Sequence, residues 1–460
     1  MTLRDLLPTL RPTLAARLEP RLWPRSAQMD CDGALRVGGV DLADMAEAYG
    51  TPAVAIDVDD IRSRIAAYRD AMPDVEIAYA AKAFLTRAMA RLVDEEGLSL
   101  DVCSGGEVGI AAAAGFPGER MILHGNVKTP ADIAAALQAG VGRIVIDSLD
   151  EITMLATMAS GLSGRQQVLI RVAPGVDAHT HAGLTTGTED QKFGLSIATG
   201  AAAEAVRRVL AQPELELVGL HCHIGSQVAT IRPYLDAATR VLDLHAAIAR
   251  EHGIELPQLD IGGGHAVAYA EGDRPLDPAE FGRVVPAFVE RACAERGVSM
   301  PRLTIEPGRA LVARAGVTVY RVAAVKRGAT RTFVAVDGGM SDNPRPALYG
   351  VRYPVRLIGR PVRDAMVAMT VVGRHCESSD VLAEDVLLPA DIAVGDLVAV
   401  PCSGAYHVSL SSTYNQVGRP PVVAVENGRT TPMLRRETLD DLLRRDVLPA
   451  DGRAVLDTAA

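Results

Sequence analysis

Lysine is scarce in this chain. Of its 47 Lys and Arg residues, only four are lysines, namely Lys82, Lys128, Lys192 and Lys326. Arginine therefore supplies most of the solvated positive charge, and a lysine in the mostly small or apolar run EIAYAAKAFL, residues 76–85, needs a reason. Either Lys82 reaches solvent from a strand end, or an amine is required there. Lysine can lose its proton when desolvated and attack a carbonyl, whereas arginine cannot.

Other absences exclude whole classes of protein. No run approaches the roughly 18 consecutive apolar residues of a membrane-spanning helix, and the first 25 residues have neither an apolar signal core nor a small-residue cleavage site. A net charge of −10 argues against a nucleic-acid-binding surface. The six cysteines form no C-x-x-C pair, so we expect a reduced, cytoplasmic chain without a structural metal site.

Eight strand-like runs, each followed by an alanine-rich helical stretch, fill residues 76–309. The runs are EIAYAAK, LSLDVCSGGE, RMILHGN, RIVIDS, VLIRVAPG, LVGLHCHIGS, QLDIGGG and LTIEPGR. Strands that alternate with helices predict parallel βαβ units, and eight units without a reversal favour an α/β fold of the TIM-type (β/α)8 barrel over an open doubly wound sheet. We assign residues 51–312 to this barrel.

The pattern changes after the eighth unit. Residues 313–460 contain valine-rich runs such as GVTVYRVAAVKRG and RTFVAVDGG, with turn residues between them and little helical periodicity. They predict a C-terminal all-β domain. Residues 1–50 include the strand-like run ALRVGGVDL, and we expect this N-terminal segment to pack with the β domain.

Polar residues end most of the barrel runs, and the carboxyl ends of barrel strands meet at one mouth, where chemistry gathers. These strand ends carry Lys82, Asp101, His124, Asp147, Arg171, His221, His223, the glycines 262–264, Glu306 and Arg309. A single such residue is usually just solvated, but eight converging ends predict a site. Lys82 is expected to face this mouth.

Two of the strand ends are suited to an anion. Gly262, Gly263 and Gly264 let backbone N–H groups approach a phosphate closely, although a tight turn that needs positive φ would also select glycine. Arg309 in the run EPGR can bind phosphate or carboxylate through two hydrogen bonds. A phosphate cradle, the carboxylate of Glu306 and a reactive lysine together suggest pyridoxal 5'-phosphate, bound as a Schiff base, with the carboxylate on its ring nitrogen.

At this point the sequence resembles a known family, the fold-type-III pyridoxal-phosphate decarboxylases, and most closely their diaminopimelate-decarboxylating branch. The resemblance runs from about residue 35 to 445. The motifs that carry it are AYAAKA, DVCSGGE, HGNVKT, DQKFGLS, GLHCHIGSQ, IGGG, EPGRALVA, VDGGMSDNPRPALYG, HCESSDVLA and GAYHVSLSSTYN. It implies decarboxylation of meso-2,6-diaminopimelate to L-lysine and CO2, the last step of lysine biosynthesis.

The resemblance also implies roles for individual residues. The cofactor contacts would be Lys82 as the Schiff-base lysine, His223 stacked on the ring, Ser226, Gly262, Gly263, Gly264, Glu306, Pro307, Gly308, Arg309 and Tyr406. The amino-acid substrate would be bound by Arg309, Arg345, Tyr349, Glu377 and Tyr406. Cys376 would be the proton donor, brought with Glu377 from the partner subunit of a head-to-tail homodimer. Opposite fixed charges suit a substrate whose far end is itself a zwitterion.

Several alternatives stay open on the sequence alone. Cys376 could be a buried apolar thiol, the usual state of a free cysteine, although its charged neighbours argue against burial. His221 shares a strand face with His223 and would replace it on the ring if the register slipped, while Cys222 faces the core. The run HAVAYAEGD after the glycines and Val127 depart from the family pattern, which leaves room for a paralogous decarboxylase of another amino acid. A racemase of the same fold, a class I aldolase and a non-catalytic cofactor-binding homologue are the other candidates.

Overall fold

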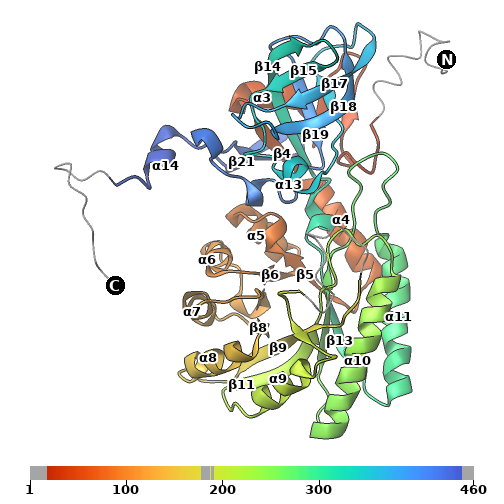
Figure 1. The fold of residues 1–460 in the computed structure, drawn as a ribbon, viewed down its shortest axis with the longest axis vertical. Coiled ribbons are helices and arrows are strands. Elements are labelled where there is room, and N and C mark those ends of the chain that lie inside the picture. Colours follow the sequence, from red (N-terminus) through yellow and green to blue (C-terminus); the bar gives the residue numbers. More distant parts are fainter. Residues whose placement is uncertain (1–17, 178–186, 188–190, 448–460) are drawn as a thin grey trace.

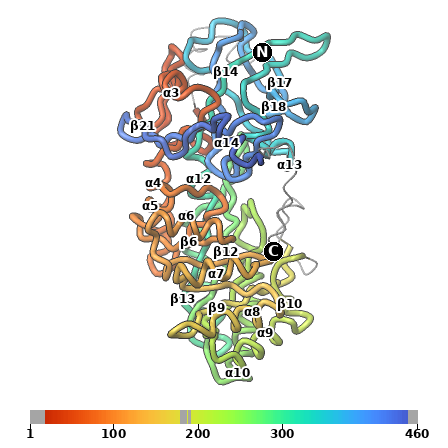
Figure 2. Tube along the Cα trace, turned by 90° about the vertical axis from the view of Figure 1, so that its left-hand side faces the viewer, coloured from red at the N-terminus to blue at the C-terminus, as the bar shows by residue number. Residues whose placement is uncertain are grey.

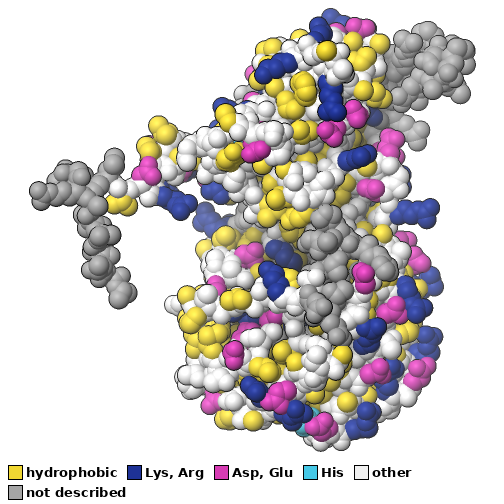
Figure 3. Space-filling view, viewed as in Figure 1, with side chains coloured by type: hydrophobic (Ala, Val, Ile, Leu, Met, Phe, Trp, Pro, Cys, Tyr) yellow, Lys and Arg dark blue, Asp and Glu magenta, His cyan; other side chains and the backbone are white. Residues whose placement is uncertain are grey.

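The computed structural model describes residues 18–177, 187 and 191–447. Two domains are stacked along the long axis of the molecule, with the barrel below and the β-rich domain above in Figures 1 and 2. No helix among the described residues is long and apolar enough to cross a membrane. On the face in Figure 3, charged side chains of both signs are interspersed over the barrel.

The barrel is a closed parallel sheet. Its strands are β5 (Glu76–Ala80), β6 (Ser99–Val102), β7 (Met121–Leu123), β8 (Arg143–Ile146), β9 (Gln166–Ala173), β11 (Leu215–His221), β12 (Gln258–Gly263) and β13 (Arg302–Glu306). They pair in this order, and β13 pairs back with β5, so the ring is complete. The predicted (β/α)8 barrel is confirmed in all eight units, and the open sheet is wrong.

Helices surround the barrel. The helices are α4 (Val58–Ala71), α5 (Arg87–Glu95), α6 (Gly105–Ala113), α7 (Pro130–Gln138), α8 (Leu149–Ala159), α9 (Ala201–Leu210), α10 (Arg232–His252) and α11 (Pro278–Arg296). Side chains such as Thr86, Ser104, Thr129 and Ser148 accept a backbone N–H at the first turn of four of them. Such N-caps stop each strand-to-helix loop at a fixed residue, and so fix where the strand ends point.

The barrel interior has an apolar layer with polar groups on both sides of it. Ala78, Ile122, Val145, Leu169 and Val218 form a small buried cluster separate from the main core. Alternate residues of a barrel strand point inward, so these five side chains fill the barrel centre. Below this layer, a partly buried polar network of Glu76, Arg143 and Gln258 lines a solvent-open pocket of about 490 Å³ at the far end. Titratable side chains above it face the mouth.

The upper domain is built on a nine-stranded sheet. Its main path runs β18 (Val381–Pro389), β17 (Met366–Val372), β15 (Thr332–Val336), β14 (Gly316–Arg327), β4 (Ala53–Asp57), β20 (Val422–Glu426) and β21 (Arg429–Leu434). Off this path, β19 (Leu397–Pro401) pairs with β14 and with β16 (Arg356–Ile358). Short helices α12 (Arg309–Val312), α13 (Arg345–Tyr349) and α14 (Leu439–Leu443) interrupt the strands. The predicted C-terminal β domain is confirmed.

The predicted start of the barrel at residue 51 was too early. β4 lies in the upper sheet between β14 and β20, antiparallel to the first and parallel to the second. The barrel therefore begins with α4, at residue 58. The described part of the N-terminal segment contains β1 (Gln28–Met29), β2 (Leu35–Val37), β3 (Val40–Asp41) and α3 (Leu42–Tyr49). Its turns bond to the upper domain, since the N–H groups of Gly359 and Gly428 donate to the carbonyls of Gly33 and Gly38 at 2.8 and 2.7 Å.

Candidate active site

Lys82 lies just past the end of β5, in the 3-10 turn η2 (Ala81–Ala83). Its Nζ forms an ion pair with the carboxylate of Asp101, which is fully buried at the end of β6, and the lysine side chain remains 37% exposed. Burial alone would lower the pKa of Lys82, but the negative charge of Asp101 outweighs it and holds this pKa well above its usual value. The negative charge of Asp101 thus opposes the proton loss that desolvation alone would favour, an effect that the sequence did not predict.

The other lysines do not share these surroundings. Lys128 is buried, and its Nζ donates to the carbonyls of Gly125 and Val145 at 2.7 Å and lies 2.8 Å from Oε1 of Glu151. All three of its hydrogens therefore have acceptors, which makes it a structural lysine. Lys192 and Lys326 are exposed. Lys82 is thus the lysine that the fold places at the barrel mouth.

The glycine triplet forms a tight turn that only glycine can make. Gly262 and Gly264 have φ of +71° and +87°, and a Cβ on Gly263 would lie 2.0 Å from the carbonyl oxygen of Glu306. The N–H of Gly263 donates to Nδ1 of His223 at 3.1 Å, so that ring nitrogen is an acceptor and is unprotonated. The tight-turn explanation of the glycines is confirmed, and it places their backbone against His223 and Glu306.

Glu306 is buried between two imidazoles at the end of β13. His124 Nε2 lies 2.6 Å from its Oε1, and His221 Nε2 lies 3.3 Å from its Oε2. Burial would raise the pKa of Glu306, but these two histidines overcome it, and the pKa lies well below its usual value. Burial also lowers the pKa of His221 to about 4. His221 therefore contacts Glu306, whereas His223 contacts the glycine turn.

Arg309 and Arg345 are buried side by side over one aromatic ring. The Arg309 guanidinium lies 5.8 Å and that of Arg345 4.3 Å from the ring centre of Tyr269. Arg309 donates to the Tyr269 hydroxyl at 2.7 Å and to Ser226 Oγ at 2.9 Å, and Arg345 donates to the Tyr353 hydroxyl at 2.6 Å. These tyrosines were not predicted from the sequence.

Neither arginine is neutralised by a carboxylate. No ion pair joins Arg309 or Arg345 to an acidic residue among those the structure describes, and Nε of each is buried without a hydrogen-bond partner. A buried charge is costly unless it is paired. Two buried guanidiniums without an acidic partner among the described residues make this place a candidate site for one or two anions.

Tyr406 connects the two domains beside Lys82. Its backbone N–H donates to the carbonyl of Ala83 at 2.8 Å, and its ring lies 4.5 Å from the Arg309 guanidinium carbon. Tyr406 has φ of +60°, in the left-handed region that few non-glycine residues adopt. Strain of this kind is common at functional sites. The structure thus brings Tyr406, Arg309 and Lys82 together, as the resemblance implied.

Cys376 and Glu377 are not brought to Lys82 within one chain. Both are exposed, in the loop between β17 and β18. The N–H of Cys376 donates to Oδ1 of Asn415 at 3.0 Å, and no described contact joins Cys376 or Glu377 to Lys82 or Glu306. The buried-thiol interpretation of Cys376 is therefore wrong. Tyr349, at the end of α13, is half-buried.

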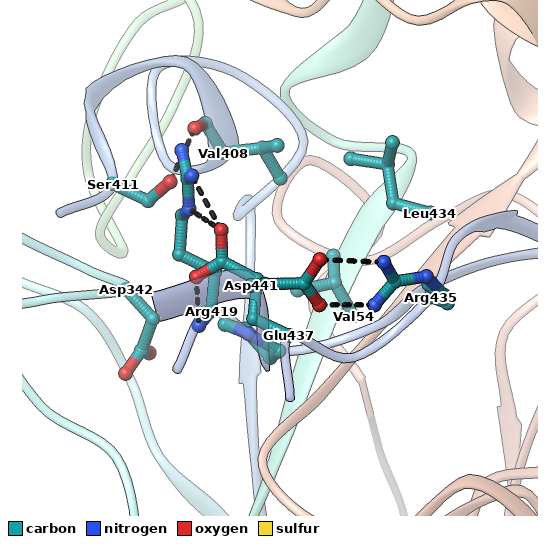
Figure 4. Close-up of a pocket in the computed structure, with 10 residues that line it drawn as sticks. Val54, Asp342, Val408, Ser411, Arg419, Leu434, Arg435, Glu437 and Asp441 are labelled. Carbon is teal, nitrogen blue, oxygen red and sulfur yellow. Dashed lines mark hydrogen bonds and ion pairs between the residues drawn. The ribbon is translucent and has the colours of Figure 1, made fainter. Parts of the chain in front are cut away.

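A cavity of about 340 Å³ lies in the upper domain, away from these groups (Figure 4). Its charged residues already have partners: Arg419 pairs with Glu437, Arg435 pairs with Asp441, and Asp342 accepts hydrogen bonds from the Tyr320 hydroxyl and the Gly339 N–H. Val408, Ser411 and Leu434 complete much of its wall, and it shares no residue with the Lys82 site. It therefore offers no unsatisfied charge or nucleophile for chemistry.

Comparisons with known proteins agree with the geometry. The family model described as pyridoxal-dependent decarboxylase, pyridoxal binding domain, matches residues 58–313. A diaminopimelate decarboxylase of Actinosynnema pretiosum subsp. auranticum is 56% identical over 97% of this chain and 100% of its own length. That of Mycobacterium tuberculosis (strain ATCC 25618 / H37Rv) is 47% identical over 93% and 98%. The crystal structure of diaminopimelate decarboxylase from M. jannaschii in co-complex with L-lysine matches with a TM-score of 0.87 and 31% identity, over 93% of this chain and 99% of that one.

Proposed function

The chain belongs to the pyridoxal-dependent decarboxylases, and from that premise we propose that it converts meso-2,6-diaminopimelate to L-lysine and CO2. The substrate assignment rests on one observation: the guanidiniums of Arg309 and Arg345 near Lys82 are buried and have no acidic partner among the described residues. One anion could be a cofactor phosphate, and a substrate carboxylate would be the second.

The residues around Lys82 fit pyridoxal 5'-phosphate. Arg309 Nε is buried without a hydrogen-bond partner, and Glu306 is a buried carboxylate at the same mouth, so the two offer opposite charges to an anionic and a cationic group of one ligand. The residues that would hold the cofactor are Lys82, His223, Ser226, Gly262, Gly263, Gly264, Glu306, Pro307, Gly308, Arg309 and Tyr406. When bound, pyridoxal phosphate supplies an electron sink for the charge left on Cα by the loss of CO2.

The protein's own groups hold the charges at the barrel mouth, and Cys376 of a second chain would return a proton to Cα after CO2 leaves. Asp101 contacts the Lys82 ammonium and orients its Nζ. Glu306, kept ionised by His124 and His221, can accept a hydrogen bond from a protonated ring nitrogen. His223 is neutral, since burial holds its pKa well below its usual value, so it can lie against an aromatic ring without adding charge.

We also propose how the far end of the substrate is held. Arg345 would bind the distal carboxylate, together with Arg309 and Tyr406, and Glu377 with Tyr349 would bind the distal ammonium. Arg345 is only 1% exposed, and its charge already acts in a largely desolvated place, where a carboxylate gains most from it.

The proposal includes a homodimer with composite sites. Cys376 and Glu377 are exposed and without contact to Lys82, so a second chain would have to bring them to the barrel mouth. The C-terminal arm supports an assembly, because α14 projects from the body in Figure 1 and carries Leu439 and Leu443 at 68% and 50% exposure. The six cysteines are all free thiols, which supports a cytoplasmic location.

One experiment tests the proposal directly. The purified protein is examined for the visible absorbance of bound pyridoxal phosphate, and CO2 release is measured with meso-diaminopimelate, its LL isomer, L-lysine, L-ornithine and L-arginine. We expect CO2 and L-lysine from the meso isomer. Release of CO2 chiefly from ornithine or lysine would identify a paralogous decarboxylase, whereas epimerisation without CO2 would identify a racemase. Absence of bound cofactor would contradict the proposal as a whole.

A further inference from the structure

Four titratable side chains lie together beneath the barrel mouth: His124, His221, Asp260 and Glu306. One ligand atom of each lies within 4.8 Å of those of the other three. They follow or belong to β7, β11, β12 and β13, and none is more than 4% exposed. Glu306 has a proposed role towards the cofactor, but Asp260 has none so far.

Asp260 points to the same side of the sheet as Glu306. It pairs in register with His221 on one side and with Thr304 on the other, and residues that are directly opposite on neighbouring strands share a face. Its Oδ1 accepts the N–H of Gly262 at 2.8 Å, which ties it to the glycine turn. Its Oδ2 is buried and has no hydrogen-bond partner, and no described cation forms an ion pair with it.

Two carboxylates this close in a buried place do not both ionise. The histidines contact Glu306 and stabilise its charge, whereas Asp260 has only a backbone N–H. Burial and the charge of Glu306 hold the pKa of Asp260 well above its usual value. The one shared proton therefore belongs to Asp260, whose Oδ2 has no hydrogen-bond partner and as an acid O–H can donate to the nearby Glu306 carboxylate.

We propose that Asp260 is a positioning residue that stays protonated and orients the ionised Glu306, so that this cluster presents a single negative charge to the cofactor's ring nitrogen. The inference rests on the proposed function. It predicts an asymmetry between two neighbouring carboxyl groups: Asp260 acts as a neutral donor, and Glu306 acts as an anion. A rival occupant is a divalent cation, since histidine nitrogens and carboxylate oxygens are both zinc ligands and one ligand atom of each of the four residues lies within 4.8 Å of the others.

Amide substitutions separate these roles without removing volume. In Asp260→Asn, Oδ1 can keep the Gly262 N–H and Nδ2 can replace the acid O–H. In Glu306→Gln the anion itself is lost. Asp260→Ala removes the hydrogen-bond donor and is compared with Asp260→Asn, which keeps one. Each protein is freed of cofactor, and its dissociation constant for pyridoxal phosphate is measured by fluorescence titration, together with the absorbance maximum of the bound cofactor and the melting temperature.

We expect Asp260→Asn to bind pyridoxal phosphate within about threefold of wild type and with an unchanged absorbance maximum. Asp260→Ala and Glu306→Gln should bind at least about tenfold more weakly, which is the size of effect expected when a buried polar group loses its partner. If Asp260→Ala does not fold, the difference in cofactor affinity between Asp260→Asn and Glu306→Gln still tests the inference. Equal loss in both amide variants, or no loss in any variant, would overturn the inference.

Metal analysis of the cofactor-free wild type tests the rival. One equivalent of a divalent cation, lost in Asp260→Asn, would show a metal site and overturn the inference. If the wild-type protein takes up no pyridoxal phosphate at all, the proposed function fails first. If the wild-type protein binds pyridoxal phosphate but Asp260→Asn and Glu306→Gln bind it equally well, only the inference about Asp260 fails.

Discussion

If the active site is built from two chains, two inactive mutants should recover activity when they form a mixed dimer. This prediction tests the composite site most directly. Lys82 lies at the barrel mouth, and Cys376 lies exposed in the upper domain with no described contact to it. If each site takes Lys82 from one chain and Cys376 from the other, Lys82→Ala and Cys376→Ala homodimers each carry the same lesion in both sites. Both homodimers should be nearly inactive.

A mixed dimer places both lesions in one site and leaves the other intact. Random exchange of an equimolar mixture gives about half heterodimers, and each of these has one working site of two. About a quarter of wild-type activity should therefore return. A heterodimer purified through two different affinity tags should reach about half of wild-type activity.

The assay is CO2 release from meso-diaminopimelate after co-expression of the two differently tagged chains. Cys31→Ala is the matched control, because Cys31 is also an exposed thiol but lies outside the site. Its heterodimer with Lys82→Ala should retain about half of wild-type activity whether or not sites are shared. The composite-site proposal would be falsified if the tagged Lys82→Ala and Cys376→Ala heterodimer were isolated and stayed as inactive as its parents.

Three further changes have definite outcomes. Lys82→Ala should abolish turnover and the absorbance of lysine-bound cofactor, and a borohydride-reduced adduct on any other lysine would contradict this. Arg345→Ala should lower kcat/KM for meso-diaminopimelate by about 30-fold or more, because the loss of a desolvated charge pair costs at least about 2 kcal/mol. Glu377→Ala should lower kcat/KM too, and both variants should bind the cofactor nearly as well as wild type. Burial raises the pKa of Asp342 to about 7, so its protonated form favours folding, and wild-type protein should lose stability relative to Asp342→Asn as the pH rises from about 4 through 7. Urea midpoints at several pH values test this, and a pH-independent difference would refute it.

The sequence was sufficient for the barrel and for much of the site because both have local signatures. Each barrel unit is a short apolar run, a polar end and a helix, and each strand end was recognised within about ten residues. Lys82 was singled out because lysine is scarce and because it stands at the end of a small, apolar strand-like run. Its ionisation state was not predictable in this way, because that depends on Asp101, whose carboxylate meets the ammonium only once β5 and β6 are paired.

Contacts between distant segments account for what was missed. Tyr269 lies in the run that departs from the family pattern, and its hydroxyl meets Arg309 forty residues later. Nothing in the periodicity of either segment indicates this contact. The run Ala53–Asp57 has the form of a barrel unit, an apolar strand followed by α4, and only its pairing with Val422–Glu426 shows that it belongs to the other sheet.

That pairing sets the order in which the chain can fold during synthesis. β4 and β14 flank the barrel in the sequence and are adjacent in space, with the N–H of Asp57 on the carbonyl of Ala315 at 2.9 Å. The barrel is thus an insertion into the upper domain, and the five buried residues of β4 have no partner strand until residue 316 has been made. At about 20 residues per second, the 259 residues from 58 to 316 (316 − 57) take about 13 s to make. Until then β4 has no β14 to pair with, so the upper sheet can be completed only after the whole barrel sequence has been synthesised.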